Sequence, residues 1–229
     1  MKKHIPNMIT LLNLLSGSVA VIYAVQGVWF AVWMLCILAA VFDFFDGFAA
    51  RALGAYSEIG KELDSLCDCV SFGLAPTVAL MTFYRNAGDY PSILGFVPLA
   101  VVACSALRLA KFNLDTRQTK SFLGLPTPAC GLLLVSLTAC PPAFLSTVWA
   151  IPVMSAVLAF LLVSEIPMFS MKKFSLKLKI FLAGSAVMSV LCFLLMRTDA
   201  VGLTLPRCLA LIFTYYILIN LIPSKRYEN

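Results

Sequence analysis

Long apolar stretches, separated by short polar connections, account for most of this 229-residue chain. A helix needs about 20 apolar residues to cross the ~30 Å hydrocarbon core of a bilayer. The hydrophobic share of 61% and the charged share of 12%, about half of what is usual, exclude an ordinary water-soluble globule. The sequence therefore predicts an all-α fold, a polytopic transmembrane helical bundle forming one membrane-embedded domain over residues 1–229. We expect about eight spans, at residues 8–25, 28–49, 62–84, 93–112, 127–146, 148–166, 178–196 and 203–222.

The positions of the basic residues indicate an orientation, because cytoplasmic connections carry the excess of Lys and Arg. If the N-terminus lies in the cytoplasm, 14 of the 17 basic residues fall on the cytoplasmic side, and the other three are Arg85, Arg197 and Arg207. We therefore expect both termini in the cytoplasm and a location in the cell (inner, cytoplasmic) membrane. The net charge of +6 is then explained by topology and by attraction to anionic lipid headgroups, so no nucleic-acid partner is expected.

Acidic residues contribute little to orientation, yet six of the eleven lie between positions 43 and 68. Asp43 and Asp46 are three residues apart at the end of the second stretch, and Asp64 and Asp68 are four apart near the start of the third. At these spacings each pair shares one helix face. Because the second span descends to the cytoplasm and the third returns, we expect the two pairs to face each other just under the cytoplasmic interface.

Four converging carboxylates in a poorly hydrated place repel one another and need a counter-charge. The basic residues nearby, Arg51 and Lys61, are too few, which favours bound divalent cations over a salt-bridged helix-end cluster. Oxygen ligands with no His or Cys ligand set beside them favour Mg²⁺, Mn²⁺ or Ca²⁺ over zinc. Small residues such as Gly47, Ala50 and Gly60 near the carboxylates are compatible with close helix packing, with the approach of a bulky ligand, or with both.

Residues 43–68 spell D-x2-D-G-x2-A-R-x8-G-x3-D-x3-D, and this pattern resembles the signature of the CDP-alcohol phosphotransferase family. The resemblance implies a CDP-linked donor, a divalent-metal requirement, and transfer of a phosphoalcohol group to an acceptor hydroxyl with release of CMP. It also implies that Asp43, Asp46, Asp64 and Asp68 ligate Mg²⁺ or Mn²⁺, two ions in all. Asp68 would in addition be the catalytic general base on the acceptor. The implied CDP/CMP-binding residues are Asn7, Gly47, Ala50, Arg51 and Gly60.

Two further segments, Arg108–Asn113 (R-L-A-K-F-N) and Phe122–Ala129 (F-L-G-L-P-T-P-A), resemble motifs of the serine-using, phosphatidylserine synthase branch of that family. This resemblance implies transfer of the phosphatidyl group from CDP-diacylglycerol to L-serine. Arg108 and Lys111 share a helix face and could hold an acceptor carboxylate or a phosphate, with Asn113 adding a hydrogen bond. The alternative is that both cations only reach toward headgroups at a cytoplasmic helix end.

Other functions remain open at this point. A sibling enzyme using glycerol 3-phosphate would also need a cationic acceptor site, whereas one using inositol would not. A cation-coupled membrane transporter would place carboxylates nearer mid-membrane, on a pathway open to both sides. The expected partners are CDP-diacylglycerol, L-serine and membrane lipids, and the sequence leaves open whether the chain forms a homodimer.

Overall fold

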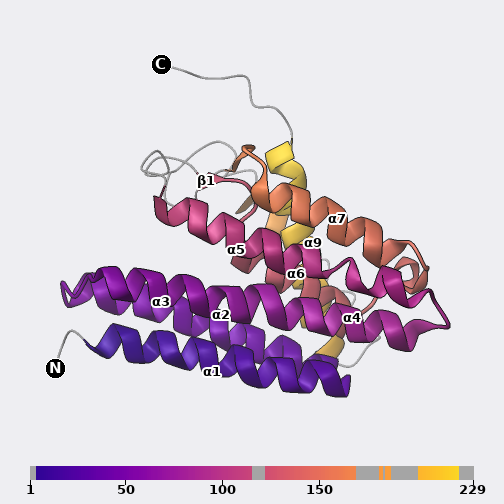
Figure 1. The fold of residues 1–229 in the computed structure, drawn as a ribbon, viewed down its shortest axis with the longest axis horizontal. Helices are drawn as coiled ribbons and strands as arrows, with labels where there is room; N and C mark the ends of the chain where they lie inside the picture. The colour runs from indigo at the N-terminus through magenta and orange to yellow at the C-terminus, as the bar shows by residue number, and fades with distance from the viewer. Residues whose placement is uncertain (1–3, 115–121, 169–180, 183, 187–200, 222–229) are drawn as a thin grey trace.

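The fold is a bundle of apolar helices (Figure 1). The computed structural model describes residues 4–114, 122–168, 181–182, 184–186 and 201–221. Within them, the helical stretches long and apolar enough to cross a membrane are α1 (Ile5–Gln26), α2 (Trp29–Ala52), Glu58–Ala87 and Ser92–Leu114. Shorter apolar helices are α6 (Thr127–Ala139), α7 (Ala150–Val163) and Leu205–Leu221 of α9 (Val201–Leu221). The protein is therefore the polytopic helical membrane protein that the sequence predicts, although the expected span 178–196 lies largely outside the described residues.

Local signals set the first two helix boundaries. Pro6 lies in the first turn of α1, where a missing backbone N–H costs no hydrogen bond. Gly27 ends α1 in the left-handed conformation, with φ 75°, and its backbone N–H donates to Ala24 O. The turn that follows sends α2 back along α1, against which it packs closely. The N-terminus of α1 and the C-terminus of α2 consequently lie at the same end of the bundle (Figure 1).

The third span is composite, and it begins earlier than residue 62. It consists of α3 (Glu58–Asp68), a π-helical turn η2 (Cys69–Leu74) and α4 (Ala75–Ala87). The early start has a local cause, because the Ser57 hydroxyl caps α3 by accepting a hydrogen bond from the Gly60 backbone N–H at 3.0 Å. A π-turn inserts one extra residue into a helix and is frequent at functional sites.

Neighbouring helices approach this π-turn through small residues. A Cβ atom on Gly17 of α1 would lie 2.7 Å from Ser71 Cα, and one on Gly131 of α6 would lie 2.5 Å from Phe72 O. The 3₁₀ turn η3 (Ser92–Phe96) leads into α5 (Leu99–Leu114), whose Ser105 Cβ would lie 3.3 Å from a Cβ on Gly73. The backbone after Asp68 is thus enclosed by three helices.

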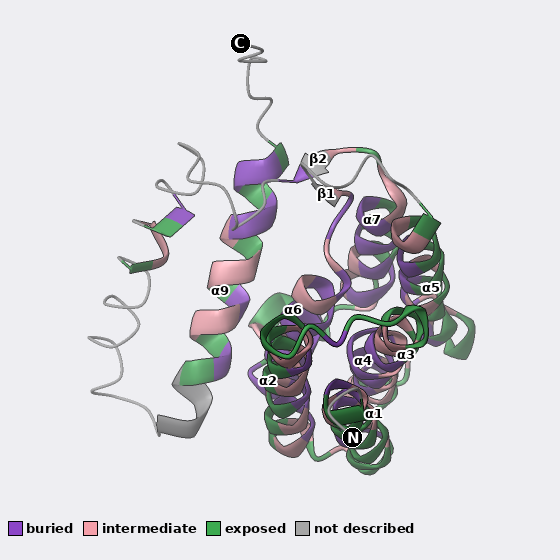
Figure 2. Ribbon diagram, turned by 90° about the vertical axis from the view of Figure 1, so that its left-hand side faces the viewer, coloured by how far each residue is buried: buried purple, intermediate pink, exposed green. Residues whose placement is uncertain are grey.

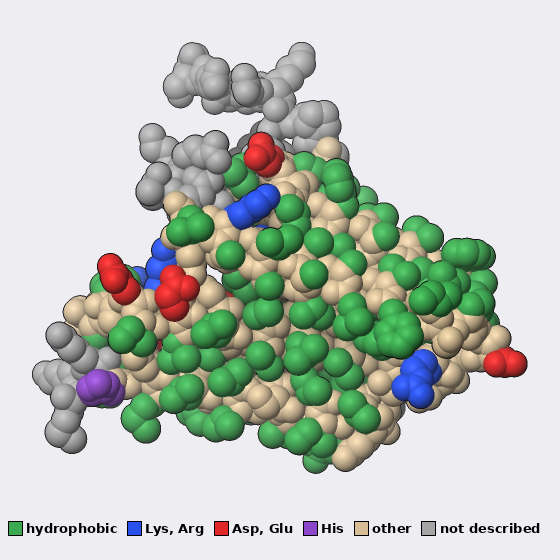
Figure 3. All heavy atoms as spheres, viewed as in Figure 1, with side chains coloured by type: hydrophobic (Ala, Val, Ile, Leu, Met, Phe, Trp, Pro, Cys, Tyr) green, Lys and Arg blue, Asp and Glu red, His purple; other side chains and the backbone are tan. Residues whose placement is uncertain are grey.

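α6 runs through the middle of the bundle and packs against α2, α4, the π-turn and α9, while α5 packs against α7. The buried faces of the central helices point toward one another, and the exposed faces point outward (Figure 2). One polar pair in this interior joins two helices, where the Trp33 indole N–H donates to Ser136 Oγ at 3.1 Å. A hydrophobic belt covers the middle of the face seen in Figure 3, and charged side chains gather toward its ends.

Two features differ from the expected all-helical pattern. α6 ends at Ala139 rather than near residue 146, because Pro141 and Pro142 follow and the 3₁₀ turn η5 (Ala143–Ser146) replaces the helix. The second feature is a two-stranded antiparallel ribbon between β1 (Phe122–Leu123) and β2 (Pro167–Met168). This ribbon ties the connection before α6 to the chain that leaves α7.

Candidate functional site

Three of the four predicted aspartates converge at one end of the bundle. Asp43 comes from α2, and Asp64 and Asp68 come from α3. Each offers a carboxylate oxygen, and these oxygens all lie within 4.8 Å of one another. Asp68 is buried, and the other two are partly exposed. The prediction that the second and third spans bring their carboxylates face to face is confirmed for these three side chains.

Asp46 lies beside this cluster and is also buried. Its Oδ2 atom and the Oδ1 atom of Asp64 are buried without a hydrogen-bond partner. In the part of the chain that the structure describes, no Lys or Arg forms an ion pair with any of these carboxylates. Unpaired buried charge is costly, and oxygen-only ligand sets suit hard divalent cations, so these residues fit a metal site.

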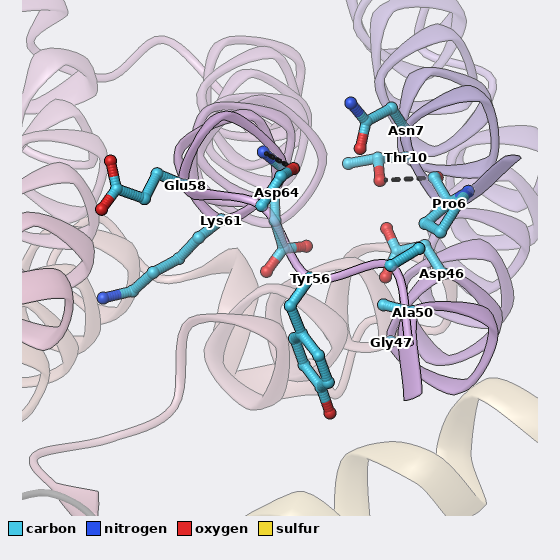
Figure 4. Close-up of a pocket in the computed structure, with 13 residues that line it drawn as sticks. Pro6, Asn7, Thr10, Asp46, Gly47, Ala50, Tyr56, Glu58, Lys61 and Asp64 are labelled. Carbon is cyan, nitrogen blue, oxygen red and sulfur yellow. Dashed lines mark hydrogen bonds between the residues drawn. The ribbon is translucent and has the colours of Figure 1, made fainter. Parts of the chain in front are cut away.

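A cavity of about 520 Å³ adjoins the carboxylates, within the range usual for small-molecule sites. Asp46 and Asp64 point into it from opposite sides (Figure 4). Its wall also contains four of the five residues predicted to bind the nucleotide, namely Asn7, Gly47, Ala50 and Gly60. The structure therefore brings together most of the predicted metal-binding and nucleotide-binding residues in one place.

Arg51 is the predicted nucleotide-binding residue that does not line this cavity. Its side chain is exposed, and its guanidinium nitrogen Nη1 lies 3.6 Å from where a Cβ on Gly47 would be. The Arg51 guanidinium thus lies next to the cavity wall rather than within it. It is carried by a flexible side chain.

The connection between α2 and α3 shapes the mouth of the cavity. Gly54 adopts the left-handed conformation with φ 59°, and the chain then passes through Ala55 and Tyr56 to the Ser57 cap. A Cβ on Gly60 would lie 2.9 Å from Ser57 Oγ and 3.0 Å from Asn7 Oδ1. Glycine at position 60 therefore serves the helix cap and leaves room for Asn7 at once.

Sequence reasoning missed several cavity residues, among them Thr10, Tyr56 and Lys61. A signal for the first existed, because Asn7, Thr10 and Asn13 recur every three residues in an otherwise apolar helix and so lie along one side of it. Asn13, the last of the series, is fully buried and donates from Nδ2 to Asp68 Oδ1 at 3.3 Å. For Tyr56, in a loop, no comparable signal exists.

Arg108 forms a second polar centre, on α5. Its side chain is only 8% exposed, and Nη1 donates to Thr127 Oγ1 at 3.2 Å. The guanidinium carbon lies 5.7 Å from the centre of the Phe112 ring, and Nε is buried without a partner. Among the charged groups that act on it, Asp68 has the largest effect, which places this cation within electrostatic range of the aspartates.

Lys111 and Asn113 do not join Arg108 in this centre. Lys111 is exposed. The Asn113 amide donates to Glu62 Oε2 at 3.2 Å and to Ser65 Oγ at 2.9 Å, and its backbone oxygen accepts from Lys61 Nζ at 2.7 Å. In the structure, Asn113 thus links α5 to α3, while its predicted role toward an acceptor stays a prediction.

These features define a polytopic membrane protein with an acidic, metal-compatible cluster beside a polar cavity at one end of its helices. The sequence profile of the CDP-alcohol phosphatidyltransferase family matches residues 3–222, so the chain belongs to this family. The family is metal-dependent and transfers a phosphatidyl group from a CDP-alcohol, and the buried aspartate cluster agrees with that requirement.

Named relatives are similar to parts of the chain. The archaetidylserine synthase of Methanothermobacter thermautotrophicus is 36% identical over 58% of this chain and 56% of its own length. The CDP-diacylglycerol–serine O-phosphatidyltransferase of Bacillus subtilis is 35% identical over 59% of this chain and 75% of its own length. The Mycobacterium leprae protein of the same name is 34% identical over 72% of this chain and 57% of its own length. The chain thus matches little more than half of two of these three relatives.

Proposed function

We propose that this protein is a CDP-diacylglycerol–serine O-phosphatidyltransferase, which transfers the phosphatidyl group of CDP-diacylglycerol to L-serine and releases CMP. The observation that carries the proposal is the cavity into which Asp46 and Asp64 point, next to the Asp43–Asp64–Asp68 cluster. The names of the similar proteins support serine as the acceptor. We further propose that residues 1–229 act as one catalytic domain in the cell membrane, with the site at the cytoplasmic face.

The cavity offers what a cytidine diphosphate group requires. Its wall combines small residues, Gly47 and Ala50, with polar ones, Asn7 and Ser57, at the ends of α1, α2 and α3. A bulky nucleotide can lie against the small residues while the polar groups orient it. Two divalent ions, Mg²⁺ or Mn²⁺, held by the aspartates would supply charge neutralisation of the diphosphate and polarisation of the phosphorus under attack.

In the proposed reaction, the serine hydroxyl oxygen attacks the phosphorus that bears diacylglycerol. An oxygen–phosphorus bond forms to serine, and the bond from this phosphorus to the bridging oxygen of the diphosphate breaks, so that CMP leaves with that oxygen. The hydroxyl proton passes to the Asp68 carboxylate. Asp68 suits this role because it is buried within the cluster and has a fixed neighbour in Asn13.

Arg108 is proposed to bind the serine carboxylate. A buried guanidinium that forms no ion pair with the described residues, and whose Nε has no partner, is available for an anion. The Asp68 carboxylate acts electrostatically on this guanidinium, which supports an acceptor site that includes both groups. Lys111 would then act at the rim of this acceptor site, and Asn113 would act there or by holding α5 against α3, as its bonds to Glu62 and Ser65 indicate.

The experiment is a CMP-release assay with purified protein, CDP-diacylglycerol and Mn²⁺ or Mg²⁺. CMP should appear when L-serine is supplied, and EDTA should abolish its release. Asp68→Asn should lower the rate by about 10²- to 10⁴-fold, because the general base is lost. Asp89→Asn is the matched control, since Asp89 is exposed in the connection after α4, and it should leave the rate unchanged.

The assay can also contradict the assignment of serine as the acceptor. Release of CMP with glycerol 3-phosphate or inositol but not with serine would overturn it and leave the family standing. Failure to release CMP from CDP-linked donors with any of these acceptors would overturn the transferase assignment as a whole and reopen transport as a function.

A further inference from the structure

The buried side chain of Asn13 connects α1 to the reactive end of α3. Its Nδ2 atom donates to Asp68 Oδ1 at 3.3 Å, while its own Oδ1 atom is buried without a partner. Neither the family signature over residues 43–68 nor the cavity wall includes this residue. A fully buried amide in an otherwise apolar helix is costly unless it serves a purpose.

The backbone of Asn13 is fixed to the π-turn that follows Asp68. Ser71 Oγ donates to Asn13 O at 3.0 Å, and both residues are fully buried. One helical turn further along α1, the absence of a side chain on Gly17 lets the two backbones meet, since a Cβ there would lie 2.7 Å from Ser71 Cα. On the other side, the Cys36 thiol lies 3.6 Å from Ser71 O. Asn13 is therefore held in position independently of its bond to Asp68.

The bond to Asn13 uses one carboxylate oxygen of Asp68 and so limits rotation of the group. The carboxylate is then presented in a single orientation to Asp43 and Asp64, whose oxygens lie within 4.8 Å of it. A carboxylate that ligates metal and accepts a proton must keep such an orientation, and hydrogen-bond partners of metal ligands commonly supply it.

We propose that Asn13 is a positioning residue for the transfer reaction, and that its side-chain amide holds the Asp68 carboxylate in the metal cluster. The role in catalysis rests on the proposed function, whereas the role in the metal cluster does not.

The test compares Asn13→Ser with Ser71→Ala in the full-length protein. The serine side chain is too short to reach Asp68 but keeps a polar group in the buried position. Ser71→Ala removes the anchor to the Asn13 backbone oxygen without touching the amide. Three measurements are made: the affinity for Mn²⁺ alone, by electron paramagnetic resonance, the steady-state constants for CMP release with serine, and the unfolding temperature.

Asn13→Ser should weaken Mn²⁺ binding and lower kcat by about 10- to 100-fold, the usual effect of losing a hydrogen-bond partner of a metal ligand. KM for CDP-diacylglycerol should stay within about threefold, because the cavity wall is unchanged. Ser71→Ala should lower the unfolding temperature by at least as much as Asn13→Ser but should change Mn²⁺ affinity and kcat far less. Asn13→Leu, which is of similar size, cannot donate a hydrogen bond and adds no charge, serves as a second variant where Asn13→Ser does not fold.

Mn²⁺ affinity of Asn13→Ser equal to that of the parent protein would overturn the proposal. Equal losses of Mn²⁺ affinity and kcat in Asn13→Ser and Ser71→Ala would also overturn it, because the effect would then belong to packing. If the parent protein binds Mn²⁺ but releases no CMP with serine, the proposed function fails while the Mn²⁺ comparison still decides the role of Asn13.

Discussion

At the scale of single residues, the cations and amides around the aspartates differ in whether their hydrogen-bonding groups are already used by other residues. Arg108 is buried and keeps Nε without a partner, whereas Asn113 uses its amide hydrogens on Glu62 and Ser65. Two residues from one short motif thus have separate tasks. The fixed orientation of the Arg108 guanidinium depends on Thr127, which lies in the second of the two motif-like segments.

Replacing Thr127 tests that dependence. Thr127→Val has nearly the same shape but cannot accept the bond from Arg108, and a hydrogen bond to a charged group contributes about 1.5 kcal/mol or more. We expect KM for serine to rise about tenfold, with KM for CDP-diacylglycerol unchanged. Thr127→Ser keeps the hydroxyl and should stay close to the parent protein. A parallel rise of both KM values would show that the substitution acts on the fold rather than on the acceptor site.

Gly47 and Gly131 offer a second residue-scale comparison, because both glycines lie in helices but face different surroundings. A Cβ on Gly131 would come within 2.5 Å of Phe72 O, a backbone atom that cannot move aside. A Cβ on Gly47 would meet only the tip of Arg51, at 3.6 Å, and would project at the cavity wall. Gly131→Ala should therefore lower the free energy of unfolding by about 1–3 kcal/mol, as overpacking does.

Gly47→Ala should instead leave stability nearly unchanged and raise KM for CDP-diacylglycerol. Thermal unfolding in detergent and the CMP-release assay separate the two effects. Loss of stability in both variants to the same degree would mean that Gly47 is small for helix packing and not for the nucleotide.

At the scale of elements, the connection before α6 is held by the end of α7. The Gly124 backbone N–H donates to Ile166 O at 3.0 Å, and that of Leu125 donates to Leu161 O at 2.9 Å. The second bond satisfies a carbonyl in the last turn of α7, where helical partners run out. The segment from Phe122 onward therefore fixes the start of α6, and with it the Thr127 hydroxyl that contacts Arg108.

Gly124 is the position on which this arrangement depends. Its φ is 74°, and a Cβ there would lie 2.5 Å from Leu162 O and 2.8 Å from Ser164 O. Gly124→Ala should destabilise the protein by about 1–3 kcal/mol, and it should also raise KM for serine as Thr127 shifts. Thermal unfolding and the acceptor kinetics measure the two consequences. Stability lowered without any change in serine KM would show that the segment between β1 and α6 does not position the acceptor site.

The elements also show which parts of the site were predictable. Helix periodicity and the antiparallel course of two adjacent spans were enough to bring Asp43 and Asp64 together. The π-turn after Asp68 was not predictable, because it depends on close contact with Gly17 and Gly131, which are distant in sequence. The link from Asn13 to Asp68 could not be read from spacing for the same reason.

At the scale of the whole molecule, the helices that contribute to the site all have one of their two ends on the same side of the bundle. The start of α1, the end of α2 and the start of α3 surround the cavity, and the end of α5 joins α3 there through Asn113. The connections between α1 and α2 and between α4 and α5 lie at the other end (Figure 1). Such one-sided placement suits an enzyme that takes a lipid from the membrane and a polar acceptor from one aqueous phase.

The orientation of this bundle gives a prediction of its own. Lys61, on the cavity wall, lies at the aspartate end, whereas Asp89 follows α4 at the opposite end. The bias of Lys and Arg places the aspartate end in the cytoplasm.

Alkaline phosphatase fused after Asp89 should therefore be active, and the same enzyme at the C-terminus of the full chain should be inactive. Green fluorescent protein should give the opposite pattern, fluorescing at the C-terminus only. Active phosphatase at the C-terminus would place that end outside and contradict the predicted even number of spans, while inactive phosphatase after Asp89 would put the aspartates on the outer face.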